Sequence, residues 1–214
     1  MKKTMQKGAQ IYSKPALFLY DFFVLKFSSS LAWKCSRHIL LNFYNQHISA
    51  NHLDIGVGTG YFLDKCTYPQ PPKIALLDLN PHTLDVTAKR VRRYQPRIYE
   101  ADILSPISLD GTFDSIGINY LLHCLPGNML DKEIVFKNTR TLLNENGVVF
   151  GATILGDKGQ ANFLARKLLT LYNTKGIFSN SEDTLHDLEM LLAKYFKRYH
   201  VTQQGHVALF SAHN

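Results

Sequence analysis

Cysteine is scarce in this sequence, and the few copies are not spaced for a cross-link or a metal. The three cysteines, Cys35, Cys66 and Cys124, are scattered, odd in number and never form C-x-x-C. This argues against a disulfide framework and against a zinc site. The nine histidines show no H-x-x-x-H pair and no mixed cluster with carboxylates. We therefore expect reduced thiols, no metal and a cytoplasmic protein.

Long apolar runs are also missing. No stretch approaches the roughly 20 residues that a helix needs to cross a bilayer, so no membrane span is predicted. Lysines precede apolar residues near the N-terminus, as in a signal peptide, but Asp21 and Lys26 interrupt the apolar stretch. No small-residue cleavage site follows at the right distance, so we interpret this segment as mature structure. A chain of 214 residues is typical of one domain with a full core.

Acidic residues are outnumbered by basic ones. The sequence has 24 Lys and Arg against 17 Asp and Glu, a formal net charge of +7, and residues 89–97 form the basic run KRVRRYQPR. Such a run suits contact with nucleic acid. It is also typical of the solvated face of a helix that covers a sheet, which is the interpretation we favour.

From residue 50 onward, short apolar runs alternate with helical patterns. This alternation is typical of β-α-β units and a parallel sheet. Five strands are predicted, at 52–57, 73–80, 97–103, 113–122 and 148–155, and two more strand-like stretches turn at Gly205 near the end of the chain. The prediction is an α/β protein with a mostly parallel seven-stranded sheet and a C-terminal antiparallel hairpin.

Proline and glycine residues indicate where the helices begin and end. Pro81 is suited to begin a helix after the second strand, and a helix at about 128–143 should end before an exit turn at Gly147. Residues 160–195 read as helix, turn and helix, and residues 12–47 carry two aromatic-rich helical patterns. Within one domain over 1–214 we expect an N-terminal helical cap (1–48), a ligand-binding core (49–155), a helical insertion or lid (156–195) and the hairpin (196–214).

The first predicted strand runs into an acid and three alternating glycines. Asp54, Gly56, Gly58 and Gly60 form D-x-G-x-G-x-G within HLDIGVGTGYFL. Glycine lets the backbone turn sharply and approach a ligand without a Cβ in the way. The acid at the end of the strand can meet hydroxyls or an amino group, so the motif indicates a nucleoside pocket.

Two further acids follow the next two strands. Strand ends in an open α/β sheet border the ligand crevice, and Asp78 and Asp102 both stand at such ends. A carboxylate at Asp78 can accept both ribose hydroxyls of a nucleoside, and Asp102 can accept from an adenine amino group. The three loops together predict one adenosine site.

Over roughly residues 50–214 the chain resembles class I S-adenosylmethionine-dependent methyltransferases, and it is similar to small bacterial members of uncharacterised substrate that share the YSKPALFLYDFFVL type of N-terminus. The resemblance implies a Rossmann-like three-layer sandwich and S-adenosyl-L-methionine as the donor. In the family pattern, Asp54 to Gly60 match the glycine motif. Asp78 with Leu79 match the ribose site, Asp102 with Ile103 the adenine site, and Asn119 the polar residue after the fourth strand.

A nicotinamide or flavin site is the main rival for the glycine loop. Dinucleotide sites use G-x-G-x-x-G, with a pyrophosphate on the helix N-terminus. Here Gly60 comes one residue early and Tyr61 occupies the expected glycine position. Asp54 disfavours a pyrophosphate by charge but suits a cationic amino-acid tail. A P-loop is excluded because no G-K-S or G-K-T follows.

His123 is the candidate catalytic residue. A sulfonium methyl group is already electrophilic, so the protein mainly aligns the nucleophile and excludes water. A base is needed only for a nucleophile that is protonated at working pH. His123 lies four residues past Asn119 and could be a base, a substrate contact or a packing residue. We assign no role to the neighbouring Cys124.

Aromatic residues gather in the expected cap and insertion, namely Tyr12, Tyr20, Phe22, Phe23 and Trp33, and then Phe163, Tyr172 and Phe178. They can be core residues at helical spacing or the lining of a lid over the strand ends. We expect Phe22 and Phe23 in the core, Tyr20 near the donor, and Tyr12 and Trp33 near the substrate.

The sequence gives the least information about the methyl acceptor. Base methylases that act on exocyclic amines carry N-P-P-Y or D-P-P-Y after the fourth strand, where this chain has NYLL. A small-molecule acceptor under a helical lid, methylated on oxygen, nitrogen or sulfur, is therefore favoured over RNA. A donor-binding protein without chemistry stays open, and the oligomeric state is not predicted.

Overall fold

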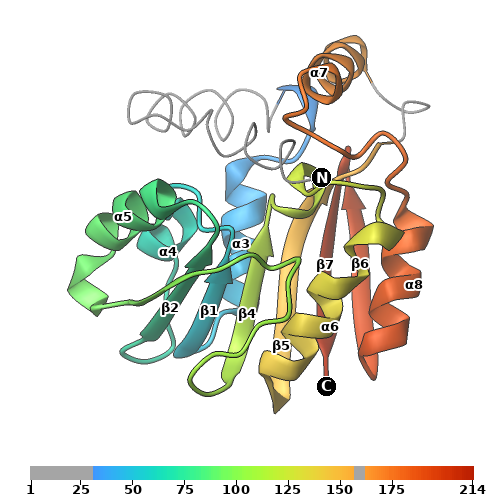
Figure 1. The fold of residues 1–214 in the computed structure, drawn as a ribbon. Helices are drawn as coiled ribbons and strands as arrows, with labels where there is room; N and C mark the ends of the chain where they lie inside the picture. The colour runs from blue at the N-terminus through green and yellow to red at the C-terminus, as the bar shows by residue number, and fades with distance from the viewer. Residues whose placement is uncertain (1–30, 157–161) are drawn as a thin grey trace.

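The computed structural model describes residues 31–156 and 162–214, and these form one seven-stranded sheet with helices on both faces (Figure 1). The strands are β1 (Asn51–Ile55), β2 (Lys73–Asp78), β3 (Arg97–Glu100), β4 (Phe113–Asn119), β5 (Leu143–Ile154), β6 (Arg198–Gln204) and β7 (Val207–His213). Their order is β3-β2-β1-β4-β5-β7-β6, and β7 is antiparallel to both of its neighbours. The expected α/β fold with a C-terminal hairpin is confirmed.

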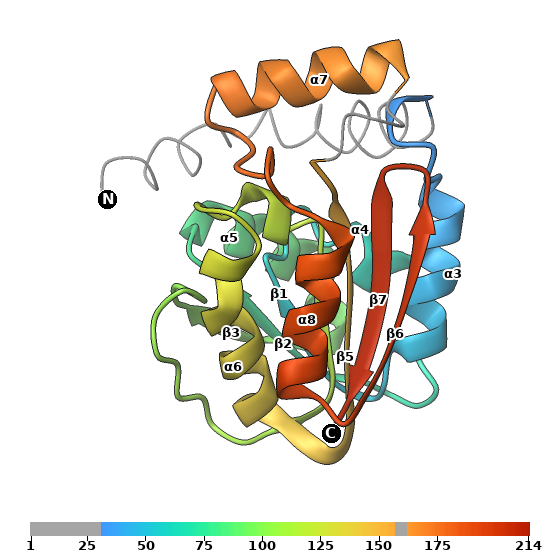
Figure 2. The same ribbon diagram turned by 90° about the vertical axis from the view of Figure 1, so that its right-hand side faces the viewer.

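The helices form two outer layers and one element above the sheet (Figure 2). They are α3 (Arg37–His47), α4 (Tyr61–Lys65), α5 (Pro81–Arg90), α6 (Glu133–Leu142), α7 (Phe163–Thr174) and α8 (Leu185–Tyr195), with 3-10 turns at Arg92–Tyr94, Leu122–Cys124 and Leu130–Lys132. Side chains of α3, α4 and α5 share one cluster with Leu76 and Phe150, whereas α6 and α8 share another with Leu77 and Val149. Successive side chains of a strand thus point to opposite faces of the sheet, as the two-residue repeat of a β-strand requires.

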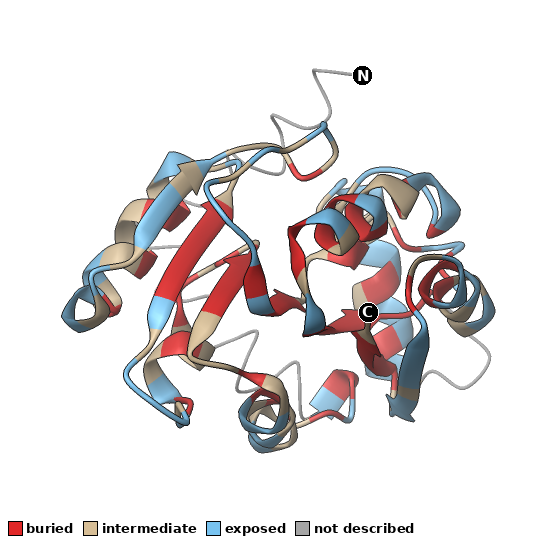
Figure 3. Cartoon of the chain, turned by 90° about the horizontal axis from the view of Figure 1, so that it is seen from below, coloured by how far each residue is buried: buried red, intermediate tan, exposed pale blue. Residues whose placement is uncertain are grey.

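The burial pattern follows the strand order. β1, β4, β5 and β7 are largely buried, whereas the edge strands β3 and β6 are mostly exposed (Figure 3). Asn80 caps α5, its side chain accepting from the His82 N–H, with Pro81 at the first turn as expected. Among the described residues no helix is long and apolar enough to cross a membrane.

The join between α6 and β5 differs from the expected exit turn. β5 begins at Leu143 directly after α6, not at residue 148. Phe113 pairs with Leu143 and Ser115 with Val148, so the partner register jumps between them. Residues 144–147 have no register partner in β4, an irregularity within the strand that a periodicity argument cannot detect.

Parts of the expected cap and lid lie within the main layers. Of the range 1–48, α3 lies flat on the sheet, where Tyr44 packs edge-on against Phe150 with ring centroids 5.0 Å apart. Of the range 156–195, α7 lies above the sheet and packs on a third cluster with Trp33, whereas α8 contributes Leu188 and Leu192 to the sheet core. Tyr12, Tyr20, Phe22 and Phe23 lie outside the described residues.

Candidate functional site

The glycine loop after β1 is wound in a conformation that favours glycine. Gly56, Gly58 and Gly60 have φ angles of +72°, +53° and +70°. A Cβ on Gly56 would meet Leu121 at 2.8 Å, and one on Gly60 would meet Thr87 at 2.7 Å. A Cβ on Gly58 would have no protein atom within 4 Å. The loop is therefore packed tightly from behind and open at Gly58.

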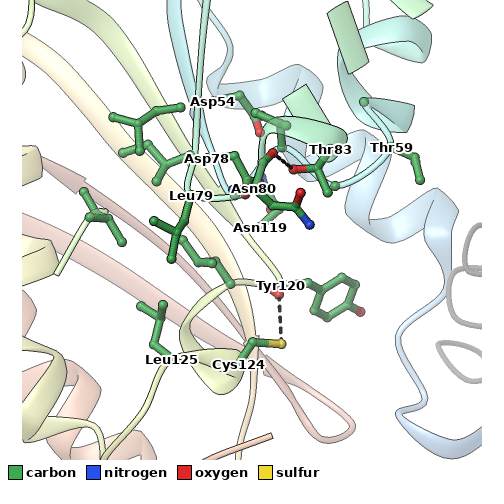
Figure 4. A pocket seen from close by; sticks show the side chains of 18 of the residues that line it. Asp54, Thr59, Asp78, Leu79, Asn80, Thr83, Asn119, Tyr120, Cys124 and Leu125 are labelled. Carbon is green, nitrogen blue, oxygen red and sulfur yellow. Dashed lines mark hydrogen bonds between the residues drawn. The ribbon is translucent and has the colours of Figure 1, made fainter. Parts of the chain in front are cut away.

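The loop borders a cavity of about 240 Å³ at the carboxyl ends of the parallel strands (Figure 4). The described residues expected to bind the donor all line it: Asp54, Gly56, Gly58, Gly60, Asp78, Leu79, Asp102, Ile103 and Asn119. The amide nitrogen of Asn119 is buried and has no hydrogen-bond partner among the described residues. Such an orphan donor is costly unless a ligand pairs with it.

The two acids beyond β1 are oriented by their own loops. Asp78 accepts a hydrogen bond from the Asn80 N–H at 2.9 Å, and the neighbouring Thr83 hydroxyl donates to the Asn80 carbonyl at 2.8 Å. Burial raises the pKa of Asp78, with a smaller contribution from the Asp54 carboxylate, against the lowering effect of the hydrogen bond from Asn80. Asp102 accepts from the Leu104 N–H at 2.9 Å. The cavity thus presents fixed carboxylate oxygens.

The other end of the cavity is apolar. The lining residues there are Tyr120, Leu121, Cys124, Leu125, Pro126 and Ile177. Tyr120 follows β4 with a φ of +56°, a left-handed conformation that is unusual for a residue with a ring. Burial raises the pKa of Cys124 to about 12, so its sulfur stays a thiol, 3.9 Å from the Tyr120 carbonyl oxygen.

A family model described as Methyltransferase domain matches residues 30–214. The chain belongs to this methyltransferase family. Demethylluteothin O-methyltransferase of Streptomyces thioluteus is 41% identical to it over 207 residues, covering 96% of this chain and 90% of the relative. The physcion biosynthesis cluster O-methyltransferase of Aspergillus chevalieri is 36% identical over 210 residues, covering 97% and 95%.

The methyltransferase also shares its fold with solved structures. The N-methyltransferase NodS from Bradyrhizobium japonicum WM9, in complex with S-adenosyl-L-homocysteine, superposes with a TM-score of 0.59 at 17% identity. The match covers 83% of this chain and 85% of NodS. The methyl donor of this family is S-adenosylmethionine, and the cavity suits it. Acids stand at the strand ends, Asn119 has an unpaired amide donor, and space is open at Gly58.

Two residues expected near the substrate do not line the methyltransferase cavity. His123 is 2% exposed, packs edge-on against Phe178 at 4.5 Å, and its Nδ1 accepts from the Ile154 N–H at 3.3 Å. Trp33 is 1% exposed and packs near the same Phe178 under α7. Both side chains are enclosed because α7 and the chain after it cover an apolar cluster of their own. The positions expected for Tyr12 and Tyr20 lie outside the described residues.

The structure brings to the cavity several residues that sequence reasoning passed over. Tyr120, Leu125 and Ile177 come from a loop, a turn and the segment after α7, and none belongs to a motif. Tyr44 of α3 donates to Asp54 from behind the cavity wall at 2.5 Å. Only the aromatic pattern of residues 12–47 hinted at it.

Part of the basic run contacts the glycine loop and the helix that follows it. Arg90 donates to the Thr59 carbonyl at 2.7 Å, and Arg93 pairs with Asp64 of α4 at 2.7 Å. These contacts give Arg90 and Arg93 a structural role in the fold.

Proposed function

We propose that this methyltransferase transfers a methyl group to the oxygen of a small apolar molecule that carries a hydroxyl group. The observation that carries the proposal is the apolar end of the cavity, formed by Leu121, Leu125 and Ile177 beside Asn119. An apolar lining of this kind suits a largely apolar acceptor. The two relatives named above are O-methyltransferases of comparable length, which supports oxygen as the acceptor atom.

The donor would be held by the strand ends. Asp54 would accept from the donor's amino group, Asp78 from the ribose hydroxyls and Asp102 from the adenine amino group. The unpaired Asn119 amide would donate to the donor's carboxylate. When bound, the donor supplies an activated methyl group, and the chain's own task is to align the acceptor and exclude water.

Binding of the donor is tested first. Asp78→Asn should weaken the binding of S-adenosylmethionine by at least about 10-fold in calorimetry, because it removes a charged acceptor for two hydroxyls. Asp85→Asn is the matched control, since Asp85 lies on α5 and pairs with Lys89 at the surface. Equal affinities for both variants would contradict the role of Asp78.

The acceptor is tested with donor carrying a labelled methyl group. The enzyme is incubated with three pools: small molecules bearing phenolic or enolic hydroxyls, amine- and thiol-bearing analogues of matched size, and total RNA. We expect label in the hydroxyl pool. Label confined to the amines, the thiols or the RNA would overturn the proposal, as would donor binding without any transfer.

A further inference from the structure

A chain of buried hydrogen bonds runs from Asp54 away from the cavity, through the sheet wall. The Tyr44 hydroxyl donates to Asp54 Oδ2 at 2.5 Å and lies 2.9 Å from His52 Nε2. His52 Nδ1 is 2.8 Å from Ser115 Oγ, and that oxygen accepts from the Ser49 N–H at 2.9 Å. These hydrogen bonds join α3, β1 and β4, and the His52 and Ser115 side chains are completely buried.

The donors in this chain can all point the same way. Ser115 Oγ lies 2.8 Å from both His52 Nδ1 and Ser49 Oγ, so its one proton can go to either atom. When Ser115 donates to His52 Nδ1, the imidazole carries its proton on Nε2 toward the Tyr44 oxygen. Burial first, and then the Asp54 charge, raise the pKa of Tyr44 well above its usual value, so the phenol keeps its proton for Asp54. In this arrangement the last hydrogen bond ends on the Asp54 carboxylate.

The Tyr44 ring is fixed by packing as well as by hydrogen bonds. It stacks on Phe62 with centroids 5.6 Å apart and an interplanar angle of 15°, and it meets Phe150 edge-on at 5.0 Å. Polar groups buried in such an apolar layer are costly unless they are paired. Of the residues in this hydrogen-bond series, Asp54 is the one that lines the cavity.

We propose that Tyr44 and His52 are positioning residues that hold Asp54 as an oriented carboxylate, so that it binds the cationic amino group of the donor. The inference rests on the proposed role of Asp54 in donor binding. One Asp54 oxygen is held by Tyr44, which leaves the other oriented for the ligand. The donor's amino-acid tail is therefore recognised from behind β1 by residues that never touch it.

The test compares ligands with and without the amino group. We expect Tyr44→Phe to weaken the binding of S-adenosylmethionine and S-adenosylhomocysteine by about 10-fold. The binding of 5′-methylthioadenosine, which lacks the amino-acid tail, should change by less than about twofold. Tyr68→Phe is the matched control, because Tyr68 is a partly buried tyrosine whose hydroxyl donates to the Leu63 carbonyl and not to Asp54.

A second pair of variants keeps the test independent of how well Tyr44→Phe folds. His52→Phe removes the donor to Tyr44 and should reproduce the selective loss, whereas His52→Gln can still donate an amide N–H and should recover most of the affinity. Equal losses for all three ligands would show a merely structural role and overturn the inference. No binding of S-adenosylmethionine to the unaltered enzyme would instead overturn the proposed function.

Discussion

His123 should make the folded protein acid-sensitive without taking part in the reaction. Its ring is 2% exposed, meets Phe178 edge-on, and has Nδ1 within 3.4 Å of Thr153 Oγ1 and 3.3 Å of the Ile154 nitrogen. Burial, and then the charge of Lys132, lower its pKa from 6.5 to about 3. The folded protein therefore holds this imidazole neutral, as an acceptor for the backbone of β5.

The sign of the pH effect follows from proton binding. Below pH 6.5 the unfolded chain takes up a proton at this position, whereas the folded chain does not until the pH nears 3, so stability is lost as pH falls. One pKa unit corresponds to about 1.4 kcal/mol. Lowering the pH from 7 to 5 should thus cost about 2 kcal/mol of unfolding free energy through His123 alone.

The assay is urea unfolding of the wild type and His123→Asn at both pH values. Asparagine keeps an acceptor near the Ile154 N–H but does not titrate, so the variant should lose about 2 kcal/mol less than the wild type on acidification. His186→Asn, which replaces an exposed histidine of α8, should behave as the wild type. An unchanged pH dependence in His123→Asn would refute the reasoning. So would a loss of turnover at pH 7 by a factor of about 100 or more, the size expected for a missing general base.

Substitutions in the glycine loop and at the buried Lys132–Asp183 pair test two other parts of the structure. Gly58→Ala should lower the free energy of unfolding by about 1–2 kcal/mol because of the positive φ at this position, and it should also weaken donor binding in calorimetry. Gly60→Ala should mainly lower the melting temperature, because its Cβ would overlap Thr87. Unimpaired donor binding by Gly58→Ala would show that the loop is not part of the donor site. Lys132→Met leaves Asp183 buried without its partner at 2.7 Å and should cost about 3–5 kcal/mol in urea unfolding, part of which Lys132→Met combined with Asp183→Leu should restore. Equal stability of the single variant and the wild type would contradict this assignment.

The parts of the fold and site that could be predicted are those set by local pattern. Strand ends in a parallel sheet share one edge, so Asp54, Asp78, Asp102 and Asn119 were expected together, and they do line one cavity. Their individual contacts with the donor stay predictions. The glycine loop could also be predicted from local pattern, since alternating glycines at a strand end indicate a sharp turn.

What could not be predicted depends on packing between distant segments. The position of His123 after β4 predicts a candidate base, but Phe178, more than fifty residues later in the chain, packs edge-on against its ring. In the sequence, Tyr44 is one aromatic residue in a helical pattern, and only the packing of α3 on the sheet brings its hydroxyl to Asp54. Periodicity specifies which face of an element is apolar but not which distant element covers it.

The strand order has a consequence for the order of folding during synthesis. β7 lies between β5 and β6 although it follows both in the chain, and it pairs with each along its whole length. A nascent chain that has emerged only as far as β6 has no partner for that strand and leaves one edge of β5 open. We expect such intermediates to need protection from aggregation until residues 207–213 insert and close the sheet.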